Sequence, residues 1–435
     1  MAEGNYLGLL GLLVFPAIAW LLSTNRSLVN LRVVAWGLGL QIAFAVFVFV
    51  VPAGREVFLV INNFVVELMN SAAAGAQFLF GRLAAPPGSS TAAGETSLGF
   101  VLAFQAFPTI IFFAALIGIL YHLRIMPTII AGFARLFSRL MRLSGAEALC
   151  AASNIFVGVE STITVKPYLS AMTRSELCVV LTAGMATVAS NVLAVYTFSL
   201  HDQFPAIAGH LVSASIMSAP AAIMMAKLIV PEDGKPVTLG IDTPPHYDRE
   251  GSLFESIISS SQSGVRLIVG IAALLVAVLG LVALINLILG GLGNLAGSMF
   301  NTELSWSLEG VLAWAAYPFT LLLGVDPSEA GAAANLIGER MVVTELVAYQ
   351  DLSQAMAAGS ISGRSAVIVS YALCGFAHIA SLAIFIGGAA ALAPERRGDL
   401  AAVGFRALIA ANLACLLTGS IAGLLADSNS ILLGS

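Results

Sequence analysis

Two glutamates lie inside apolar stretches of the chain where a charge is costly. Glu160 falls in "SNIFVGVESTITVKPY", which is otherwise small, branched and apolar, beside Ser161, Thr162 and Thr164. Glu345 lies in a second stretch of the same kind. An ionised side chain at the centre of a bilayer costs about 2.5 to 3.5 kcal/mol on insertion scales, so it is usually retained for a function. We therefore treat both carboxylates as candidate binding groups.

The composition identifies a polytopic membrane protein. Of the 435 residues, 59% are hydrophobic and only 10% are charged, whereas about a quarter of a soluble domain is charged. The net charge of −5 gives no basis for a nucleic-acid partner. Cys150, Cys178, Cys374 and Cys415 are far apart in apolar segments, which favours buried free thiols over disulfides or a zinc site.

Apolar runs of about 20 residues predict membrane-spanning helices. Segment 308–324 is short enough to be part of a broken element. Residues 57–82 and 123–146 mix polar or basic residues with apolar ones, which is typical of helices lying in the membrane interface. Polar loops are predicted at 83–97, 231–250 and 394–399. The candidate spans are 6–24, 33–52, 98–121, 176–198, 206–230, 266–290, 308–324, 365–391 and 404–426.

Two apolar regions are interrupted by glycine and glutamate. Residues 145–172 are broken near Gly158–Glu160, and residues 330–362 are broken around Gly338–Glu345. Unwound backbone at membrane depth is tolerated only where it is buried in protein or lines a cavity. We predict that each region is a re-entrant hairpin.

The same pattern follows each hairpin. Arg-Ser pairs at Arg174 and Arg364 open long apolar helices, and Asn191 and Ser381 lie seventeen residues beyond those arginines in small, polar stretches. A hairpin followed by a helix with a polar centre therefore occurs twice. Discontinuous helices in repeats are typical of transporters, in which they meet near the bilayer midplane and form the substrate site.

The polar residues near the breaks admit two interpretations each. The glutamates could accept hydrogen bonds from a solute, or they could pair with Lys166 or Arg340 and only hold the hairpins together. Asn154 and Thr187 could join exposed carbonyls around a hard cation such as Na⁺. Thr187 could instead bond back to its own helix, as threonine often does.

Two residues of the second broken helix have similar alternatives. His378 lies in mid-span in "CGFAHIAS", and its place opposite the Asn191 region favours a binding role over that of a satisfied core histidine. Phe376 could stack on a planar ring or make ordinary core contacts.

The sequence does not favour an enzyme. It lacks a Walker A loop and the HExxH, GxSxG and zinc-deaminase patterns, and no set of nucleophile, base and metal ligands is evident. A non-transporting receptor is also disfavoured, because two buried glutamates facing two broken helices suit a transport site better.

The chain resembles the concentrative nucleoside transporters over residues 98–426. The resemblance lies in "FPTIIFFAALIGILYHL", "SNIFVG", "MTRSEL", "ELVAY", "SYALCGFAHIASLAIFIGG" and "LAPERRGDL". It implies a symporter driven by Na⁺, or by H⁺ in some bacterial members, that works as a homotrimer in the bacterial inner membrane without a cofactor. The expected fold is an all-α polytopic membrane protein of about eight transmembrane helices plus two re-entrant hairpins, with a repeat-related transport domain and a scaffold domain.

The resemblance also implies site residues. Glu160 matches the glutamate facing the base of the nucleoside, and Glu345 matches the one that binds the ribose. The implied substrate site comprises Glu160, Ser161, Thr162, Val192, Thr344, Glu345, Phe376, His378 and Ser381. The implied Na⁺ site comprises Asn154, Val157, Thr187 and Val188, largely through backbone carbonyls.

The first hairpin departs from the family pattern of Gly-Gln-Thr/Ser-Glu. It reads Gly158-Val159-Glu160, so the amide that reads the base and the hydroxyl near the cation are missing, and Ser161 or Thr162 could replace them. Thr344 and His378 stand where the family has asparagine. Two functions therefore stay open: import of nucleosides or nucleoside-like solutes by alternating access, or transport of another small polar solute on the same fold.

The expected organisation follows from these segments. It comprises N-terminal transmembrane and interfacial helices (1–97), a scaffold helix and an amphipathic helix (98–144), the first hairpin and unwound-helix repeat (145–230), a polar loop and interfacial segment (231–265), scaffold helices (266–329), the second hairpin and unwound-helix repeat (330–392) and a C-terminal helix (393–435).

Overall fold

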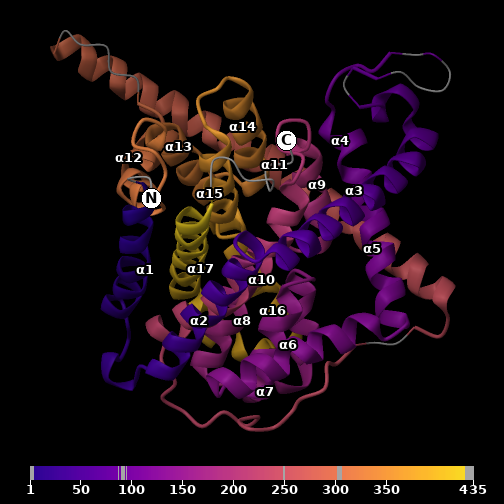
Figure 1. Cartoon of the computed structure of the whole chain (residues 1–435), viewed down its shortest axis with the longest axis vertical. Helices are drawn as coiled ribbons and strands as arrows, with labels where there is room; N and C mark the ends of the chain where they lie inside the picture. Colours follow the sequence, from indigo (N-terminus) through magenta and orange to yellow (C-terminus); the bar gives the residue numbers. More distant parts are fainter. Residues whose placement is uncertain are drawn as a thin grey trace.

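Backbone polar groups inside a bilayer must be paired within the protein, and helices achieve this within one segment. The computed structural model describes residues 4–426 except 87, 90–93, 95, 248–249 and 301–305, and most of these residues are helical. The longer helices are α1 (Gly4–Leu21), α2 (Leu31–Phe49), α3 (Pro52–Phe80), α5 (Phe107–His122), α6 (Ile125–Met141), α7 (Gly145–Asn154), α8 (Arg174–Ala186), α9 (Ser190–Leu200), α10 (Ile207–Ile229), α11 (Leu253–Phe300), α12 (Leu308–Leu322), α13 (Ala330–Val342), α14 (Glu345–Ala357), α15 (Gly363–Leu373), α16 (Ile379–Leu392) and α17 (Arg397–Leu425) (Figure 1).

The predicted all-α polytopic fold is confirmed. Among the described residues, seven helical segments are long and apolar enough to cross a membrane, and three shorter apolar helices accompany them, at Tyr6–Leu21, Leu308–Leu322 and Ile379–Leu392. The seven are Leu31–Phe49, Pro52–Ala84, Leu102–His122, Arg174–Leu200, Ile207–Ile229, Leu253–Leu295 and Pro394–Leu425.

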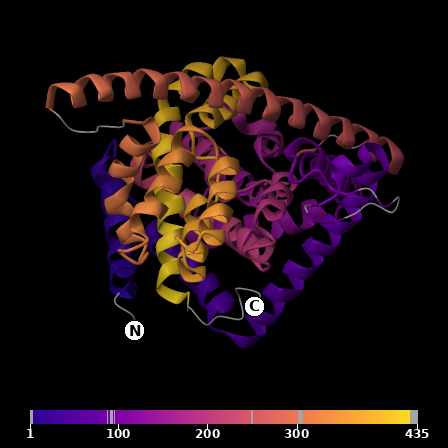
Figure 2. The same ribbon diagram turned by 90° about the horizontal axis from the view of Figure 1, so that it is seen from above.

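The helices divide into a buried bundle and an outer layer. In the most apolar window of α8–α9 and of α10, 89% of the residues are buried, against 11% in α11. Figure 2 shows α11 stretched along one side of the molecule, outside the other helices. An apolar helix with so little protein contact requires lipid or another subunit on its free face. The buried bundle and the outer layer correspond to a transport domain and a scaffold domain.

Both predicted hairpins are present. The first consists of α7 and the 3₁₀ helix η3 (Val159–Ala171), and the second consists of α13 and α14. The helix after each hairpin is broken as predicted, at 187–189 between α8 and α9 and at 374–378 between α15 and α16. The predicted repeat of hairpin and interrupted helix therefore exists in the structure.

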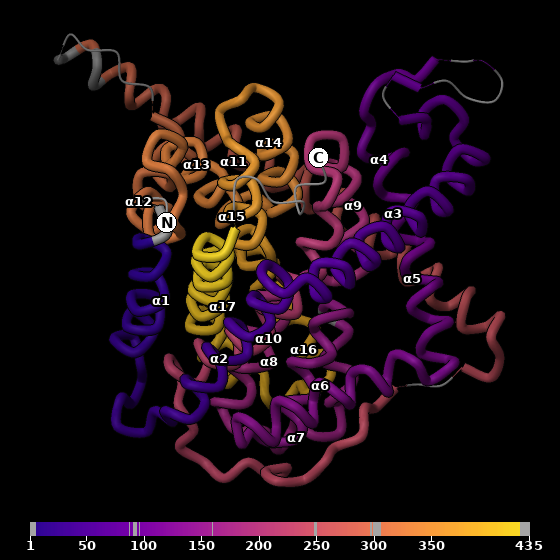
Figure 3. Tube along the Cα trace, in the orientation of Figure 1, coloured from indigo at the N-terminus to yellow at the C-terminus, as the bar shows by residue number. Residues whose placement is uncertain are grey.

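The connection between α10 and α11 runs under the first hairpin (Figure 3). The amide of Gly145 donates to the carbonyl of Thr238 at 2.9 Å, and the amide of His246 donates to that of Thr164 at 3.0 Å. The rings of Tyr247 and Tyr121 lie 5.9 Å apart. This loop thus links the first hairpin to the end of α5.

Two predicted boundaries differ from the structure. The separate interfacial segment expected before residue 266 is instead the start of α11, because the hydroxyls of Ser261 and Ser263 bond to carbonyls four residues earlier and leave the serine-rich stretch helical. Likewise the candidate span 404–426 lies within a longer helix, α17, which begins at Arg397, where Asp399 accepts hydrogen bonds from Arg174 and Arg396. Residues 57–82 and 125–141 are helical, and their placement in the interface stays a prediction.

Helix caps at the base of the first hairpin converge on a buried lysine. Ser144 and Thr173 form capping boxes with Glu147 and Glu176. The Lys227 ammonium of α10 lies 2.7 Å from Oε2 of Glu147. These contacts join α7, α8 and α10 into one unit.

Replacing Lys227 with methionine is expected to destabilise the bundle. Glu147 is 2% exposed, and breaking a buried ion pair leaves an uncompensated charge that costs about 3 to 5 kcal/mol. The melting temperature in detergent should fall for Lys227→Met and recover in part for the double variant Lys227→Met/Glu147→Gln. A single variant as stable as the unaltered chain would contradict this role.

Candidate functional site

The hairpin tips and helix breaks meet around one cavity. It has a volume of about 110 Å³ and is walled mainly by apolar side chains. Seven of the nine predicted substrate residues line it: Glu160, Val192, Thr344, Glu345, Phe376, His378 and Ser381. Residues as far apart in the sequence as Glu160 and Ser381 are therefore brought together.

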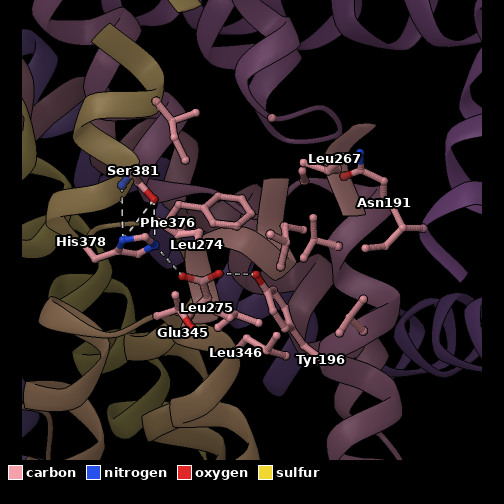
Figure 4. A pocket seen from close by; sticks show the side chains of 18 of the residues that line it. Asn191, Tyr196, Leu267, Leu274, Leu275, Glu345, Leu346, Phe376, His378 and Ser381 are labelled. Carbon is pink, nitrogen blue, oxygen red and sulfur yellow. Dashed lines mark hydrogen bonds and ion pairs between the residues drawn. The ribbon is translucent and has the colours of Figure 1, made fainter. Parts of the chain in front are cut away.

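Glu345 is held in a hydrogen-bonded cluster at one side of the cavity (Figure 4). The Tyr196 hydroxyl donates to its Oε1 at 2.6 Å, and Nε2 of His378 lies 3.2 Å from its Oε2. Glu345 is the first residue of α14, where the helix dipole favours a negative charge. The alternative in which Glu345 pairs with Arg340 is therefore wrong, and the carboxylate is oriented toward the cavity by a tyrosine and a histidine.

His378 contributes both to the helix start and to the site. It caps α16 by accepting from the amide of Ser381 at 3.3 Å, and the Ser381 hydroxyl lies 2.8 Å from its Nε2. The imidazole is 2% exposed in a cavity wall. The two interpretations of His378 thus combine, since its hydrogen bonds fix the ring against Glu345.

Glu160 lies where this cavity meets a second one. Its side chain is exposed, and it forms no ion pair within 4.0 Å with the part of the chain that the structure describes. The second cavity, of about 280 Å³, is lined by Glu160, Asn191, Tyr121, His246 and serines of α11. Glu160 and Asn191 line both cavities. A polar solute that passes from one cavity to the other therefore meets the same two polar side chains.

Asn191 faces the Glu345 cluster across the cavity (Figure 4). Its Oδ1 is buried and has no hydrogen-bond partner among the described residues. An unsatisfied buried acceptor costs about 1 to 3 kcal/mol, which a donor on a bound solute would recover. Asn191 belongs to the site, although the sequence indicated it only as a repeat position.

Ser161 and Thr162 do not line this cavity, unlike the other seven predicted substrate residues, and their binding of substrate stays a prediction. Both are buried, and the Ser161 hydroxyl donates to Oδ1 of Asn154 at 2.8 Å. The residues after Glu160 are wound as a 3₁₀ helix of about three residues per turn, which turns Ser161 toward α7. Ser161 therefore lies beside Asn154, one of the predicted cation residues.

The predicted cation residues lie on two adjacent backbone segments. The amide of Ser190 donates to the carbonyl of Phe156 at 2.9 Å, and the Ser215 hydroxyl lies 3.0 Å from the carbonyl of Ile155 and 3.4 Å from that of Val188. The breaks that contain Val157 and Val188 are thus side by side. Neutral oxygens on unwound backbone are the donors that transporters use for Na⁺.

The Thr187 hydroxyl bonds back to its own helix, as one of its two interpretations predicted. It donates to the carbonyl of Ala183 at 2.9 Å, one turn back in α8. This bond uses only the hydroxyl hydrogen, so the hydroxyl oxygen and the carbonyl of Thr187 both keep lone pairs. The side-chain oxygen of Asn154, another of the predicted cation residues, accepts from the Ser161 hydroxyl.

The second break packs directly on the first. Gly375 has φ +118°, and a Cβ built there would lie 2.7 Å from the carbonyl oxygen of Met185 and 2.9 Å from that of Ala186. Only glycine combines this conformation with such a close approach. The two broken helices therefore touch through backbone at their interruptions.

Few sequence signals mark the residues of the remaining cavity wall. Tyr196, which orients Glu345, was hidden in an apolar run, and its hydroxyl was the only signal. Leu267 and Leu275 of α11 and Phe107 of α5 line the cavity. Their apolar side chains look the same in sequence as lipid-facing ones, so only the packing shows their place.

Known proteins are similar to this chain in both sequence and fold. The family models "Na+ dependent nucleoside transporter N-terminus" and "C-terminus" match residues 10–83 and 210–423, and "Nucleoside recognition" matches 103–202. The chain is 38% identical to the uncharacterized transporter YutK of Bacillus subtilis, covering 96% of this chain and 98% of that one. It is 32% identical to the nucleoside permease NupC of Helicobacter pylori, covering 99% and 100%.

A solved structure of CNTnw in an inward-facing substrate-bound state has the same fold. Its TM-score is 0.85 at 34% identity, covering 97% of this chain and 98% of that one. Repeated hairpins and broken helices around a central cavity define a secondary transporter and not an enzyme. The chain belongs to the concentrative nucleoside transporter family, as its sequence indicated, and is an integral membrane protein.

Proposed function

We propose that this chain imports nucleosides or nucleoside-like solutes across the bacterial inner membrane by cation-coupled alternating access, as a homotrimer. The observation that carries the proposal is the fixed Glu345 carboxylate, with Tyr196 and His378, facing Glu160 and Asn191 across an apolar cavity. Relatives with nucleoside transport in their names favour nucleosides over an unrelated polar solute.

The two ends of the cavity suit the two parts of a nucleoside. A carboxylate accepts hydrogen bonds from ribose hydroxyls, and Glu345 is oriented for this. Phe376 and Val192 supply apolar surface for a planar base, while Glu160 and Asn191 supply acceptors at the other end. Because Glu160 has no glutamine before it, we expect base preference to depend on Asn191.

We also propose that Na⁺ is the coupling ion, with H⁺ as the alternative that the same experiments test. Asn154 Oδ1, the Ser161 hydroxyl and the carbonyls of the adjacent breaks at Val157 and Val188 form a neutral oxygen set. The family's Na⁺ dependence supports this choice. Ser161 would supply the hydroxyl that the first hairpin lacks before Glu160.

Thermal stability of the purified protein tests the solute class. A ligand of the folded state present at about 100 times its dissociation constant stabilises by about 2.7 kcal/mol. We expect nucleosides to raise the melting temperature, and more so in NaCl than in choline chloride, while free sugars have no effect. Stabilisation by sugars or amino acids with none by any nucleoside would favour the alternative solute.

Replacing Glu160 with glutamine is expected to raise the KM for nucleoside uptake by about tenfold, as for the loss of one charge-assisted hydrogen bond. Glu67→Gln, on an exposed position of α3, is the matched control and should leave KM unchanged. Uptake kinetics in proteoliposomes measure both. An unaltered KM in Glu160→Gln would remove Glu160 from the site.

A further inference from the structure

Helix α6 has an ordered outer face in addition to the face that packs on the protein. It runs crosswise from the lower end of α5 toward α7 (Figure 1). Its inner face is formed by Ile130, Ala134, Phe137 and Met141, which are buried. Packing within the chain accounts for this inner face, so the order of the outer face has another cause.

Two rows of side chains divide the outer face of α6. Ile125, Ile129 and Leu136 lie within about 40° of one another around a helix of 3.6 residues per turn, and they are 40 to 44% exposed. Arg135 and Arg139 form the adjacent row and are also exposed. An apolar row beside an arginine row is typical of helices that lie in the membrane surface, with the apolar row among the acyl chains.

The chain around this face is strongly basic. Residues 22–32 and 123–144 together contain six arginines and no aspartate or glutamate. The two segments are in contact, because Nε of Arg32 donates to the carbonyl of Leu140 at 2.8 Å. Short connections rich in arginine face the cytoplasm, where the membrane surface is anionic. The outer face of α6 therefore has the charge that an anionic surface attracts.

Exposed tryptophans lie near the same connection. The guanidinium carbon of Arg26 lies 5.2 Å from the centroid of the Trp20 ring near the end of α1. Trp20 and Trp36, which follows the start of α2, are 43% and 39% exposed. Tryptophan is enriched at the boundary between membrane and water. These rings therefore support a position of the α1–α2 connection, and of the end of α6 that it contacts, at this boundary.

The arginine row is only weakly neutralised by the protein. Arg135 lies 3.8 Å from Asp242 of the α10–α11 connection, and their side chains are 59% and 61% exposed. An exposed ion pair of this kind contributes about 0 to 1 kcal/mol. It therefore competes poorly with a surface that carries many negative charges.

The inner face of α6 supports the first hairpin. The ring of Phe133 lies 6.0 Å from the ring of Phe156, which follows α7 just before the Gly158–Glu160 tip. The carbonyl of Phe156 accepts from the amide of Ser190 in the first helix break. Whatever holds α6 from outside consequently also holds the hairpin and the break in place.

We propose that the outer face of α6 docks on anionic phospholipids of the cytoplasmic leaflet. Arg135 and Arg139 contact the headgroup phosphates, and Ile129 and Leu136 lie among the acyl chains. Arginine suits phosphate because its planar fork of donors matches the phosphate oxygens. The docked lipid stabilises the first hairpin from the membrane side, whichever solute and coupling ion the chain uses.

The melting temperature of the full chain in neutral detergent, titrated with phosphatidylglycerol, tests the partner. Phosphatidylglycerol should raise it in a saturable way, and the rise should shrink in about 0.5 M salt, which screens exposed charges. Phosphatidylcholine and inorganic phosphate should raise it much less, since one lacks net charge and the other lacks acyl chains. An equal rise with either of them would overturn the inference.

Variants of α6 test the place of binding. Arg139→Gln should raise the phosphatidylglycerol concentration for half-maximal stabilisation by about fivefold, whereas Arg139→Lys, which keeps the charge, should change it little. Leu136→Ser should also raise it several-fold, because it removes apolar surface from the acyl chains. Lys235→Gln, at an exposed position of the α10–α11 connection, is the control and should leave it unchanged.

These results separate docking on α6 from a general effect of charge. Unchanged half-maximal concentrations in Arg139→Gln and Leu136→Ser would overturn the inference, and so would an equal loss in Lys235→Gln. The melting temperature without lipid checks that each variant is folded. Where one variant does not fold, the other variant and the comparison of lipids decide. No step of this test requires transport, so failure of the proposed function would be seen separately, as absent nucleoside uptake.

Discussion

Replacing Glu345 with glutamine is expected to reduce kcat/KM for nucleoside uptake by about 100-fold or more. The carboxylate accepts the Tyr196 hydroxyl at 2.6 Å and lies 3.2 Å from Nε2 of His378, so it is held in one orientation in the cavity wall. Glutamine keeps the shape but loses the charge and presents an amide donor where a hydroxyl-accepting oxygen is needed. A site built to bond a hydroxyl loses the most when its polar partner is mismatched.

Uptake into proteoliposomes with a fixed inward gradient measures this loss. Glu67→Gln serves again as the control, and Tyr196→Phe should give a smaller loss of about tenfold, because it removes only one bond to the carboxylate. Folding is checked by the melting temperature without ligand. If Glu345→Gln were folded and transported within twofold of the unaltered protein, the proposed solute site would be wrong.

Replacing Gly375 with alanine is expected to destabilise the protein by roughly 2 to 5 kcal/mol, through backbone strain and overpacking together. The residue has φ +118°, and an added Cβ would meet the carbonyl oxygens of Met185 and Ala186 at 2.7 and 2.9 Å. These atoms are backbone and cannot move aside without displacing the end of α8. Because the two breaks touch here, uptake should fall along with stability.

The matched control is Gly387→Ala in α16, where a Cβ would have no atom within 4 Å. Alanine in a helix is favoured over glycine by up to about 1 kcal/mol, so this variant should be as stable as the unaltered chain or slightly more stable. Melting temperatures of both variants in the same detergent give the comparison. A Gly375→Ala protein as stable as Gly387→Ala would show that the breaks are not in close contact.

The repeated architecture could be predicted because its signals are local. Glycine and glutamate in apolar runs marked the hairpin tips at Gly158–Glu160 and near Glu345, and small polar stretches marked the breaks around Asn191 and before Ser381. An interruption of an apolar helix has few physical explanations, and buried discontinuous backbone is the main one. The resemblance then supplied the roles that spacing alone could not.

The remaining features depend on how distant segments pack. Ser161 was expected in the solute site, but the 3₁₀ winding of η3 turns it to Asn154 instead. Tyr196 and the leucines of α11 show nothing in sequence that separates a cavity wall from a lipid-facing surface. Arg340 was considered only as a partner for Glu345, whereas it contacts the second helix break.

Gradient-driven accumulation is the most direct test of the central claim that this chain concentrates nucleosides through the Glu345 cavity. Proteoliposomes are loaded without nucleoside, placed in a mixture of labelled purine and pyrimidine nucleosides, and given an inward Na⁺ or H⁺ gradient. We predict accumulation above the external concentration that collapses when an ionophore removes the gradient and that is absent in Glu345→Gln. No accumulation of any nucleoside under either gradient, by protein that is folded and inserted, would contradict the claim.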